Sequence, residues 1–205
     1  MADLSHDPDY FLELQTQTGW GAMLRSFASW LDPQPASAIL DVGTGPGLLP
    51  AIFTQQGCHA LGIDSTLDMF ENALHTNLIL GDVYALPFQP ATFNLITASN
   101  LLFLLPDPQT ALHEMARLLK PNGEIALLNP SEKMTVAAAT ALADERRLTG
   151  LARETLLNYA SRAERHIRWG VGELEQLFSS ASCQLTATQP KMGAGLVRFA
   201  RGKRH

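Results

Sequence analysis

The sequence predicts a doubly wound α/β fold in which a mostly parallel sheet of seven strands carries helices on both faces. From Ala36 onward, short apolar runs alternate with helical patterns, which is typical of stacked strand–helix–strand units. The chain has 205 residues, 46% of them hydrophobic and 17% charged, which suits a single core. We therefore predict one domain, residues 1–205, with an antiparallel last strand and a helical insertion after the fifth strand.

The first five strands are predicted from apolar runs that end at turn residues. They are residues 39–42, 59–63, 78–80, 93–98 and 124–128. A helix to about Gln56 should follow the first strand, because Gly57 suits a helix end. We expect a helix of about ten residues between the second and third strands. Asp107 and Pro108 are typical of a helix start, so another helix should follow the fourth strand.

The remaining segments are predicted to surround this cofactor-binding core of residues 36–130. Residues 131–168 are rich in Ala, Leu, Glu and Arg and indicate two inserted helices that wall a pocket. Residues 169–205 should hold the last helix and two final strands, 183–188 and 196–200. Residues 1–35 contain an aromatic-rich helical segment, which we predict to be a lid, with simple packing against the sheet as the alternative.

Composition excludes several classes of protein. The 15 Lys and Arg against 20 Asp and Glu leave a net charge of −5, so no positive field attracts nucleic acid. No apolar run approaches the roughly 20 residues that span a bilayer, and residues 1–20 lack a signal-peptide pattern; we expect a cytoplasmic protein. Cys58 and Cys183 have no metal-ligand spacing, so we expect two reduced thiols and no metal site.

A glycine-rich turn between the first strand and its helix is the motif that carries chemistry. Glycines let a backbone approach a ligand, and the helix N-terminus presents unsatisfied N–H groups. Asp64 follows the second strand, 21 residues after Gly43, where a carboxylate can accept hydrogen bonds from ribose hydroxyls. The two features together predict an adenosine-containing cofactor.

Spacing within the turn favours one cofactor over another. Dinucleotide-binding turns have the pattern GxGxxG, whereas residues 43–47 form GxGxG and position 48 is Leu. Asp41 adds negative charge beneath the turn, which suits a cationic amino-acid group better than a pyrophosphate. We therefore predict S-adenosyl-L-methionine, with an NAD-dependent oxidoreductase as the less favoured alternative.

Four motifs in order resemble those of class I S-adenosylmethionine-dependent methyltransferases, in the group that includes the menaquinone and ubiquinone methyltransferases. They are residues 39–47, 62–69, 81–88 and 118–123. The resemblance runs from about Ala36 to Pro130 and implies a Rossmann-like fold, with S-adenosyl-L-homocysteine as the product. The chain departs from the family pattern at Asn94, where Asp is usual, and at Asn122, where a second Gly is usual.

The resemblance also implies roles for individual residues. The glycine turn would hold the methionine end of the cofactor, and Asp64 would bind the ribose. Asp82 and the Val83 N–H would bind adenine, and Met69 would cover it. The predicted cofactor-binding residues are Asp41, Gly43, Thr44, Gly45, Gly47, Asp64, Ser65, Met69, Asp82, Val83, Ser99 and Asn100.

Methyl transfer requires positioning more than a catalytic cluster, because the cofactor carries its own leaving group. A base is needed only if the acceptor must lose a proton. Candidates are His113, Tyr159 and His166, for each of which packing or solvent exposure is the commoner role, so no catalytic residue is assigned. We expect a small apolar or aromatic acceptor and a monomer or homodimer. A domain that binds the cofactor without transferring methyl is the alternative.

Overall fold

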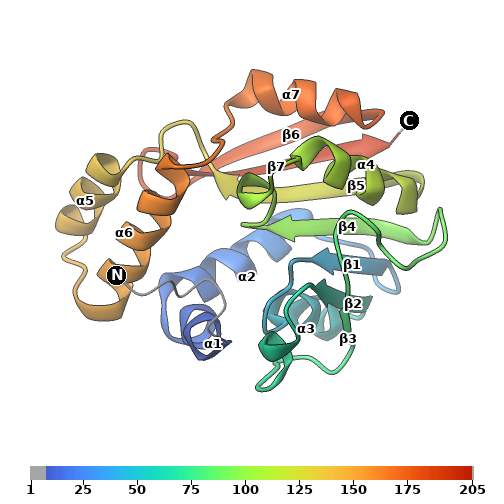
Figure 1. The fold of residues 1–205 in the computed structure, drawn as a ribbon, viewed down its shortest axis with the longest axis horizontal. Helices are drawn as coiled ribbons and strands as arrows, with labels where there is room; N and C mark the ends of the chain where they lie inside the picture. Colours follow the sequence, from blue (N-terminus) through green and yellow to red (C-terminus); the bar gives the residue numbers. More distant parts are fainter. Residues whose placement is uncertain (1–7, 205) are drawn as a thin grey trace.

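In the computed structural model, which describes residues 8–204, a seven-stranded mixed sheet forms the centre of the molecule (Figure 1). Its strand order is β3-β2-β1-β4-β5-β7-β6, with β7 antiparallel to both neighbours and the other pairings parallel. The strands are β1 (Ala38–Val42), β2 (His59–Asp64), β3 (Leu78–Leu80), β4 (Phe93–Ser99), β5 (Leu119–Pro130), β6 (Cys183–Lys191) and β7 (Val197–Arg204). The predicted doubly wound fold is confirmed.

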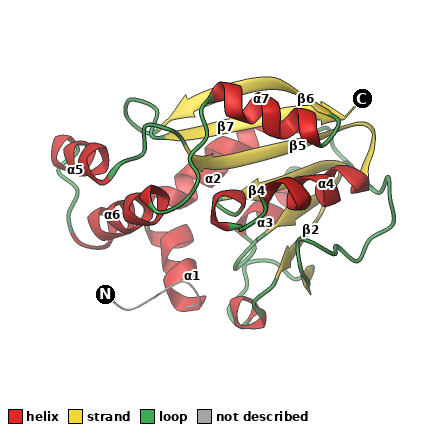
Figure 2. Ribbon diagram, turned by 45° about the horizontal axis from the view of Figure 1, so that its top comes forward, coloured by secondary structure: helices red, strands yellow, loops and turns green. Residues whose placement is uncertain are grey.

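Helices cover both faces of this sheet. The α-helices are α1 (Pro8–Gln17), α2 (Gly19–Leu31), α3 (Leu48–Gln55), α4 (Pro108–Leu118), α5 (Val136–Glu145), α6 (Gly150–Glu164) and α7 (Val171–Ser180). Two short 3-10 helices, η1 (Leu67–Phe70) and η2 (Leu102–Leu104), complete the set. Figure 2 shows α4 and α7 in front of the sheet and α2 behind it. In Figure 1 the arrowheads of β1, β4 and β5 point toward the side where α6 lies.

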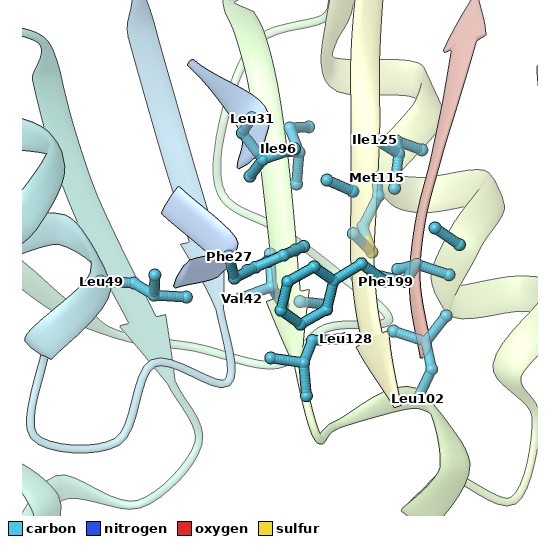
Figure 3. Packing of buried hydrophobic residues seen from close by; sticks show 14 of the residues in the cluster. Phe27, Leu31, Val42, Leu49, Ile96, Leu102, Met115, Ile125, Leu128 and Phe199 are labelled. Carbon is cyan, nitrogen blue, oxygen red and sulfur yellow. The ribbon is translucent and has the colours of Figure 1, made fainter. Parts of the chain in front are cut away.

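The core on the α2 face is built on aromatic packing (Figure 3). Phe27 of α2 and Phe199 of β7 are both fully buried, and their ring centroids are 4.9 Å apart. Leu128 of β5 lies beside them and is also fully buried. Each such side chain contributes about 1.5–3 kcal/mol through burial alone, so this cluster anchors the β5–β7 half of the sheet.

Helix α4 begins where the sequence predicts and also holds a loop of the candidate site. The Asp107 carboxylate accepts a hydrogen bond from the Thr110 N–H at 3.0 Å and caps the helix. Glu114 accepts from the Leu86 N–H at 3.0 Å, while Arg117 donates to the carbonyl of Phe88 at 3.0 Å. These contacts fasten the segment between β3 and β4 to α4.

The predicted helix of about ten residues between β2 and β3 is wrong. The structure has only the four-residue η1 at this place. Beyond it, the Leu74 N–H donates to the carbonyl of Pro46 at 2.7 Å, and His75 Nε2 lies 3.1 Å from the carbonyl oxygen of Ala60. These tertiary contacts take the place of the hydrogen bonds of a longer helix, so the helix propensity of this segment does not decide its structure.

The N-terminal segment divides into two helices with different surroundings. Trp20, Leu24 and Phe27 of α2 are buried in the core, so for this helix the alternative of packing against the sheet is correct. Helix α1 contacts η1 instead. A lid function of residues 1–35 stays a prediction, and residues 1–7 of it lie outside the described residues. Within residues 8–204, no helix is long and apolar enough to cross a membrane.

Candidate functional site

The glycine turn after β1 adopts a conformation that side chains rarely allow. Gly43, Gly45 and Gly47 have φ angles of +69°, +56° and +86°, in the left-handed region that glycine tolerates. The N–H groups of Gly43 and Thr44 both donate to the carbonyl of Ile63, at 2.8 and 3.1 Å. This fork ties the turn to β2, and Gly47 then serves as the N-cap of α3.

Asp64, the last residue of β2, lies directly at this turn. Its Oδ2 accepts a hydrogen bond from the Gly45 N–H at 2.8 Å, and its Oδ1 accepts from the Thr66 N–H at 3.1 Å. Each carboxylate oxygen can accept more than one hydrogen bond. The structure therefore brings together the two features that the sequence places 21 residues apart, with the carboxylate already oriented by backbone donors.

Asp41 is a buried carboxyl beneath the turn, with 2% of its surface exposed. Burial raises the pKa of Asp41 to about 7, because the charged form loses its hydration. The Thr97 hydroxyl donates to Asp41 Oδ1 at 2.6 Å and opposes this rise, while the Asp64 carboxylate adds to it. Near neutral pH this carboxyl is divided between its charged and uncharged forms, so a nearby ligand charge can shift its ionisation.

Thr44 places a buried hydroxyl inside the turn. Its Oγ1 has no close hydrogen-bond partner among the described residues, but it faces the Asp41 carboxyl and helps to hold the pKa of Asp41 down. The side chain packs against the backbone of Gly62, where an added Cβ would lie 2.6 Å from Thr44 Oγ1. A ligand atom at the turn would give this hydroxyl a closer partner and so stabilise it.

Of the residues expected at the adenine end, Asp82 and Val83 lie on the loop that α4 fastens, and Met69 lies in η1. Asp82 is exposed, and its Oδ1 accepts from the Tyr84 N–H at 2.9 Å. Val83 and Met69 are buried, at 9% and 5% exposure, and Ser65 is exposed. Their assignment to the cofactor stays a prediction.

The turn after β4 meets the glycine turn after β1. Asn100 follows Ser99 at the end of β4, has a φ of +56°, and donates its N–H to the carbonyl of Leu128 at 2.7 Å. Leu101 then packs on Gly43, where an added Cβ would lie 3.0 Å from the leucine methyl groups. This contact places the turn that carries Ser99 and Asn100, two of the predicted cofactor-binding residues, against the glycine turn.

Sequence reasoning missed one residue near the site and undervalued another. Gln15 of α1 places its Nε2 3.7 Å from the position that a Cβ on Gly45 would take, and its Oε1 is buried without a partner among the described residues. Tyr159 of α6 donates its hydroxyl to Asn100 Oδ1 at 2.7 Å. No local pattern marks either residue, because both reach the site through tertiary packing.

The histidine candidates lie outside this cluster of contacts. His113 is exposed, and its Nδ1 lies 2.8 Å from the Gln109 carbonyl oxygen of its own helix, as expected for a solvated residue. His166 is also exposed, with its ring edge-on to Phe103 at 6.1 Å. Across the described part of the chain, no group of three or more His, Cys, Asp or Glu residues is arranged to hold a metal ion. Cys58 and Cys183 are buried free thiols.

The sequence that carries these site residues can be compared with known protein families. Residues 40–127, which span the glycine turn, Asp64 and the turn after β4, match a family described as a methyltransferase domain. This segment is therefore similar to a methyltransferase domain. The resemblance inferred from the four motifs is thereby confirmed for the segment that carries most of them.

Individual relatives resemble this chain in sequence, and solved structures resemble it in fold. A demethylmenaquinone methyltransferase of Corynebacterium kroppenstedtii is 34% identical over 99 residues, covering 47% of this chain and 43% of the relative. The TehB-like SAM-dependent methyltransferase of Corynebacterium glutamicum superposes with a TM-score of 0.66 at 15% identity, covering 99% and 100% of the two chains. The magnesium protoporphyrin IX methyltransferase of Synechocystis PCC 6803 superposes at 0.67 and 14%, covering 91% and 84%. This chain thus spans about half the length of its relative, whereas the fold is shared throughout.

Proposed function

We propose that the protein is an S-adenosylmethionine-dependent methyltransferase that acts on a small apolar or aromatic acceptor. One observation carries the proposal: the Asp64 carboxylate is hydrogen-bonded to the Gly45 N–H of the glycine turn within a segment similar to a methyltransferase domain. Turn and carboxylate lie at the carboxyl ends of β1 and β2, where open α/β sheets bind their ligands.

The residues present fit this cofactor. Three glycines with positive φ remove side chains from the turn, and the buried Thr44 hydroxyl has no close partner among the described residues and can bond a polar ligand atom. The pKa of Asp41 is about 7, so a nearby cationic ligand group would lower this pKa and favour the charged carboxylate. A pyrophosphate would instead meet the Asp41 carboxyl beneath the turn, which disfavours the nicotinamide alternative.

The protein's own groups would act by binding and orientation. When bound, S-adenosylmethionine supplies both the methyl group and the leaving group for an in-line displacement. Asp64 would accept hydrogen bonds from the ribose, and Asp41 would balance positive charge beneath the turn. Leu101, packed on Gly43, would exclude water on the methyl side. Positioning of this kind supplies much of the rate enhancement without a dedicated base.

Two observations support a small uncharged acceptor. The chain has a net charge of −5, which does not favour polyanionic substrates. The Corynebacterium kroppenstedtii relative is named for demethylmenaquinone, and we extend that likeness to propose a similar aromatic acceptor class for this protein.

Calorimetric titration with S-adenosylmethionine and S-adenosylhomocysteine tests the proposal. We expect both to bind, and Asp64→Ala to weaken binding by about 1–3 kcal/mol, the loss expected for hydrogen bonds to a charged group. Asp64→Asn should weaken it less, because one acceptor oxygen remains. Failure of both ligands to bind the wild-type protein at millimolar concentration would refute the proposal.

Asp68→Ala is the matched control, since Asp68 is an exposed carboxylate in the neighbouring η1. It should leave the affinity unchanged. A thermal shift with NAD but not with S-adenosylmethionine would favour the oxidoreductase alternative. Formation of methylated product in a screen of phenolic acceptors would exclude the non-catalytic binding domain.

A further inference from the structure

The side chain of Asn100 is held by a residue from the inserted helix α6. The Tyr159 hydroxyl donates to Asn100 Oδ1 at 2.7 Å. The two residues are 59 positions apart, and the contact joins α6 to the turn after β4. Because Asn100 adopts a φ of +56° and its N–H is bonded to Leu128, its backbone is also fixed. Both ends of this asparagine are therefore constrained.

Tyr159 in turn is fixed by aromatic neighbours on two sides. The Trp20 ring lies edge-on to it with centroids 4.5 Å apart, and the Phe103 ring lies edge-on at 5.8 Å. Trp20 and Phe103 are buried at 5% and 2% exposure, whereas Tyr159 keeps part of its surface exposed. Edge-on rings stabilise each other by about 0.5–1.5 kcal/mol beyond burial, so these two contacts hold the Tyr159 ring in place.

The hydroxyl contact leaves the other half of the Asn100 carboxamide available. With Oδ1 accepting from Tyr159, the Nδ2 group makes no hydrogen bond to any residue from 8 to 204. Nδ2 carries two donor hydrogens. Its neighbour Leu101 packs on Gly43, so the turn that carries Asn100 lies against the turn expected to hold the cofactor.

We propose that Asn100 donates a hydrogen bond from Nδ2 to an oxygen of a planar aromatic acceptor, and that Tyr159 is the positioning residue that orients Asn100 and stacks against the acceptor ring. This inference rests on the proposed function and adds to it the acceptor class, a phenol or another ring-bound oxygen. A flat ring suits the partly exposed aromatic surface of Tyr159, and the ring oxygen suits the donor.

Three probes separate the ring from the oxygen: 4-ethylphenol has both, ethylbenzene has only the ring, and 4-ethylcyclohexanol has only the hydroxyl. Equilibrium dialysis with the full chain and saturating S-adenosylhomocysteine measures their affinities. We expect 4-ethylphenol to bind about 5- to 10-fold more tightly than either of the others, the factor that one hydrogen bond or one aromatic contact supplies. Equal binding of the three, or no measurable binding of 4-ethylphenol, would overturn the proposal.

Two variants separate orientation from stacking. Tyr159→Phe keeps the ring but loses the hydroxyl, so the preference for 4-ethylphenol over ethylbenzene should fall toward one while ethylbenzene affinity is retained. Tyr159→Leu removes the ring and should weaken ethylbenzene as well, by about fivefold. An unchanged preference in Tyr159→Phe would show that Tyr159 does not act through Asn100, because a merely structural role would weaken both probes equally.

Tyr84→Phe is the matched control. The Tyr84 hydroxyl accepts a hydrogen bond from the Asp107 N–H at 3.3 Å, so this variant also deletes a bonded tyrosine hydroxyl. It should leave the preference unchanged. Calorimetry with S-adenosylhomocysteine is carried out on the wild-type protein and on every variant. If the wild-type protein binds S-adenosylhomocysteine but shows no preference for 4-ethylphenol, only the acceptor assignment is refuted. If the wild-type protein does not bind S-adenosylhomocysteine, the proposed function is refuted.

Discussion

Replacing Asp41 with asparagine should remove a pH dependence of stability that this buried carboxyl imposes. In the folded protein, burial raises the pKa of Asp41 from its ordinary value of 3.8 to about 7. The folded state therefore binds this proton more tightly than the unfolded state does. Asp41 contributes stability that is fully present below pH 3.8 and is lost as the pH rises toward about 7. Asparagine has nearly the same shape, can still accept the Thr97 hydrogen bond, and does not titrate.

The size of the effect follows from the difference between the two pKa values. Each pKa unit corresponds to about 1.4 kcal/mol, so a rise from 3.8 to about 7 corresponds to about 4 kcal/mol. At pH 4 the wild-type protein and Asp41→Asn should have nearly equal free energies of unfolding. At pH 8 the variant should be the more stable by up to about 4 kcal/mol.

Urea denaturation followed by tryptophan fluorescence, at one-unit steps from pH 4 to pH 8, measures this difference. Other ionisable groups affect both proteins alike, so the difference between the two curves isolates Asp41. Thr97→Val is the complementary variant: it removes the donor that favours the charged form, so the stability of that variant should keep falling to higher pH than in the wild type. A constant difference between Asp41→Asn and wild type across the range would refute this reasoning.

Three further predictions concern packing and charge. Phe199→Ala should lower the free energy of unfolding by about 3–5 kcal/mol, as large-to-small changes do at fully buried positions, measured by urea denaturation. Gly202→Ala should destabilise by about 1–3 kcal/mol, because the new methyl would overlap the buried ring of Phe178; thermal unfolding measures it. Hydrogen bonding to Arg117 lowers the pKa of Glu114, so its contribution is present above the ordinary value and lost as the pH falls through the lowered one. Glu114→Gln should therefore cost about 1 kcal/mol at pH 7 and little at pH 3 in denaturation midpoints.

Each of these has a control in the chain. Phe199→Leu keeps most of the buried volume and should cost clearly less than Phe199→Ala; an equal cost would contradict the packing argument. Gly172→Ala adds a methyl in open space in α7 and should be tolerated where Gly202→Ala is not. A Glu114→Gln effect that is the same at both pH values would show that the carboxylate charge does not contribute.

Much of the fold was predictable because its signals are local. Asp107 and Pro108 start α4 by supplying a cap and a preset backbone angle, which depend on neighbouring residues alone. The first five strands are apolar because both faces of a parallel sheet are covered, so their positions follow from runs of apolar residues. The β5 boundary was less predictable, since the strand begins at Leu119, whereas the sequence predicts its start at residue 124.

What failed in prediction depended on distant partners. The helix expected after β2 is replaced by contacts of Leu74 with Pro46 and of His75 with Ala60, neither of which a local pattern contains. The approach of Gln15 to the glycine turn likewise depends on where α1 packs. Such residues come from segments that carry no motif, so their roles can be inferred only from their positions in the folded protein.

The amino-acid sequence alone places the candidate site features in order along the chain: a glycine turn, then Asp64, then the turn after β4. It does so because each follows a run of apolar residues that indicates a strand. Only the tertiary structure decided that the Asp64 carboxylate bonds the turn at Gly45, that burial brings the pKa of Asp41 to about 7, and that Tyr159 holds Asn100. Hydrogen bonding and desolvation depend on the distances and surroundings of atoms, which folding sets and residue order does not.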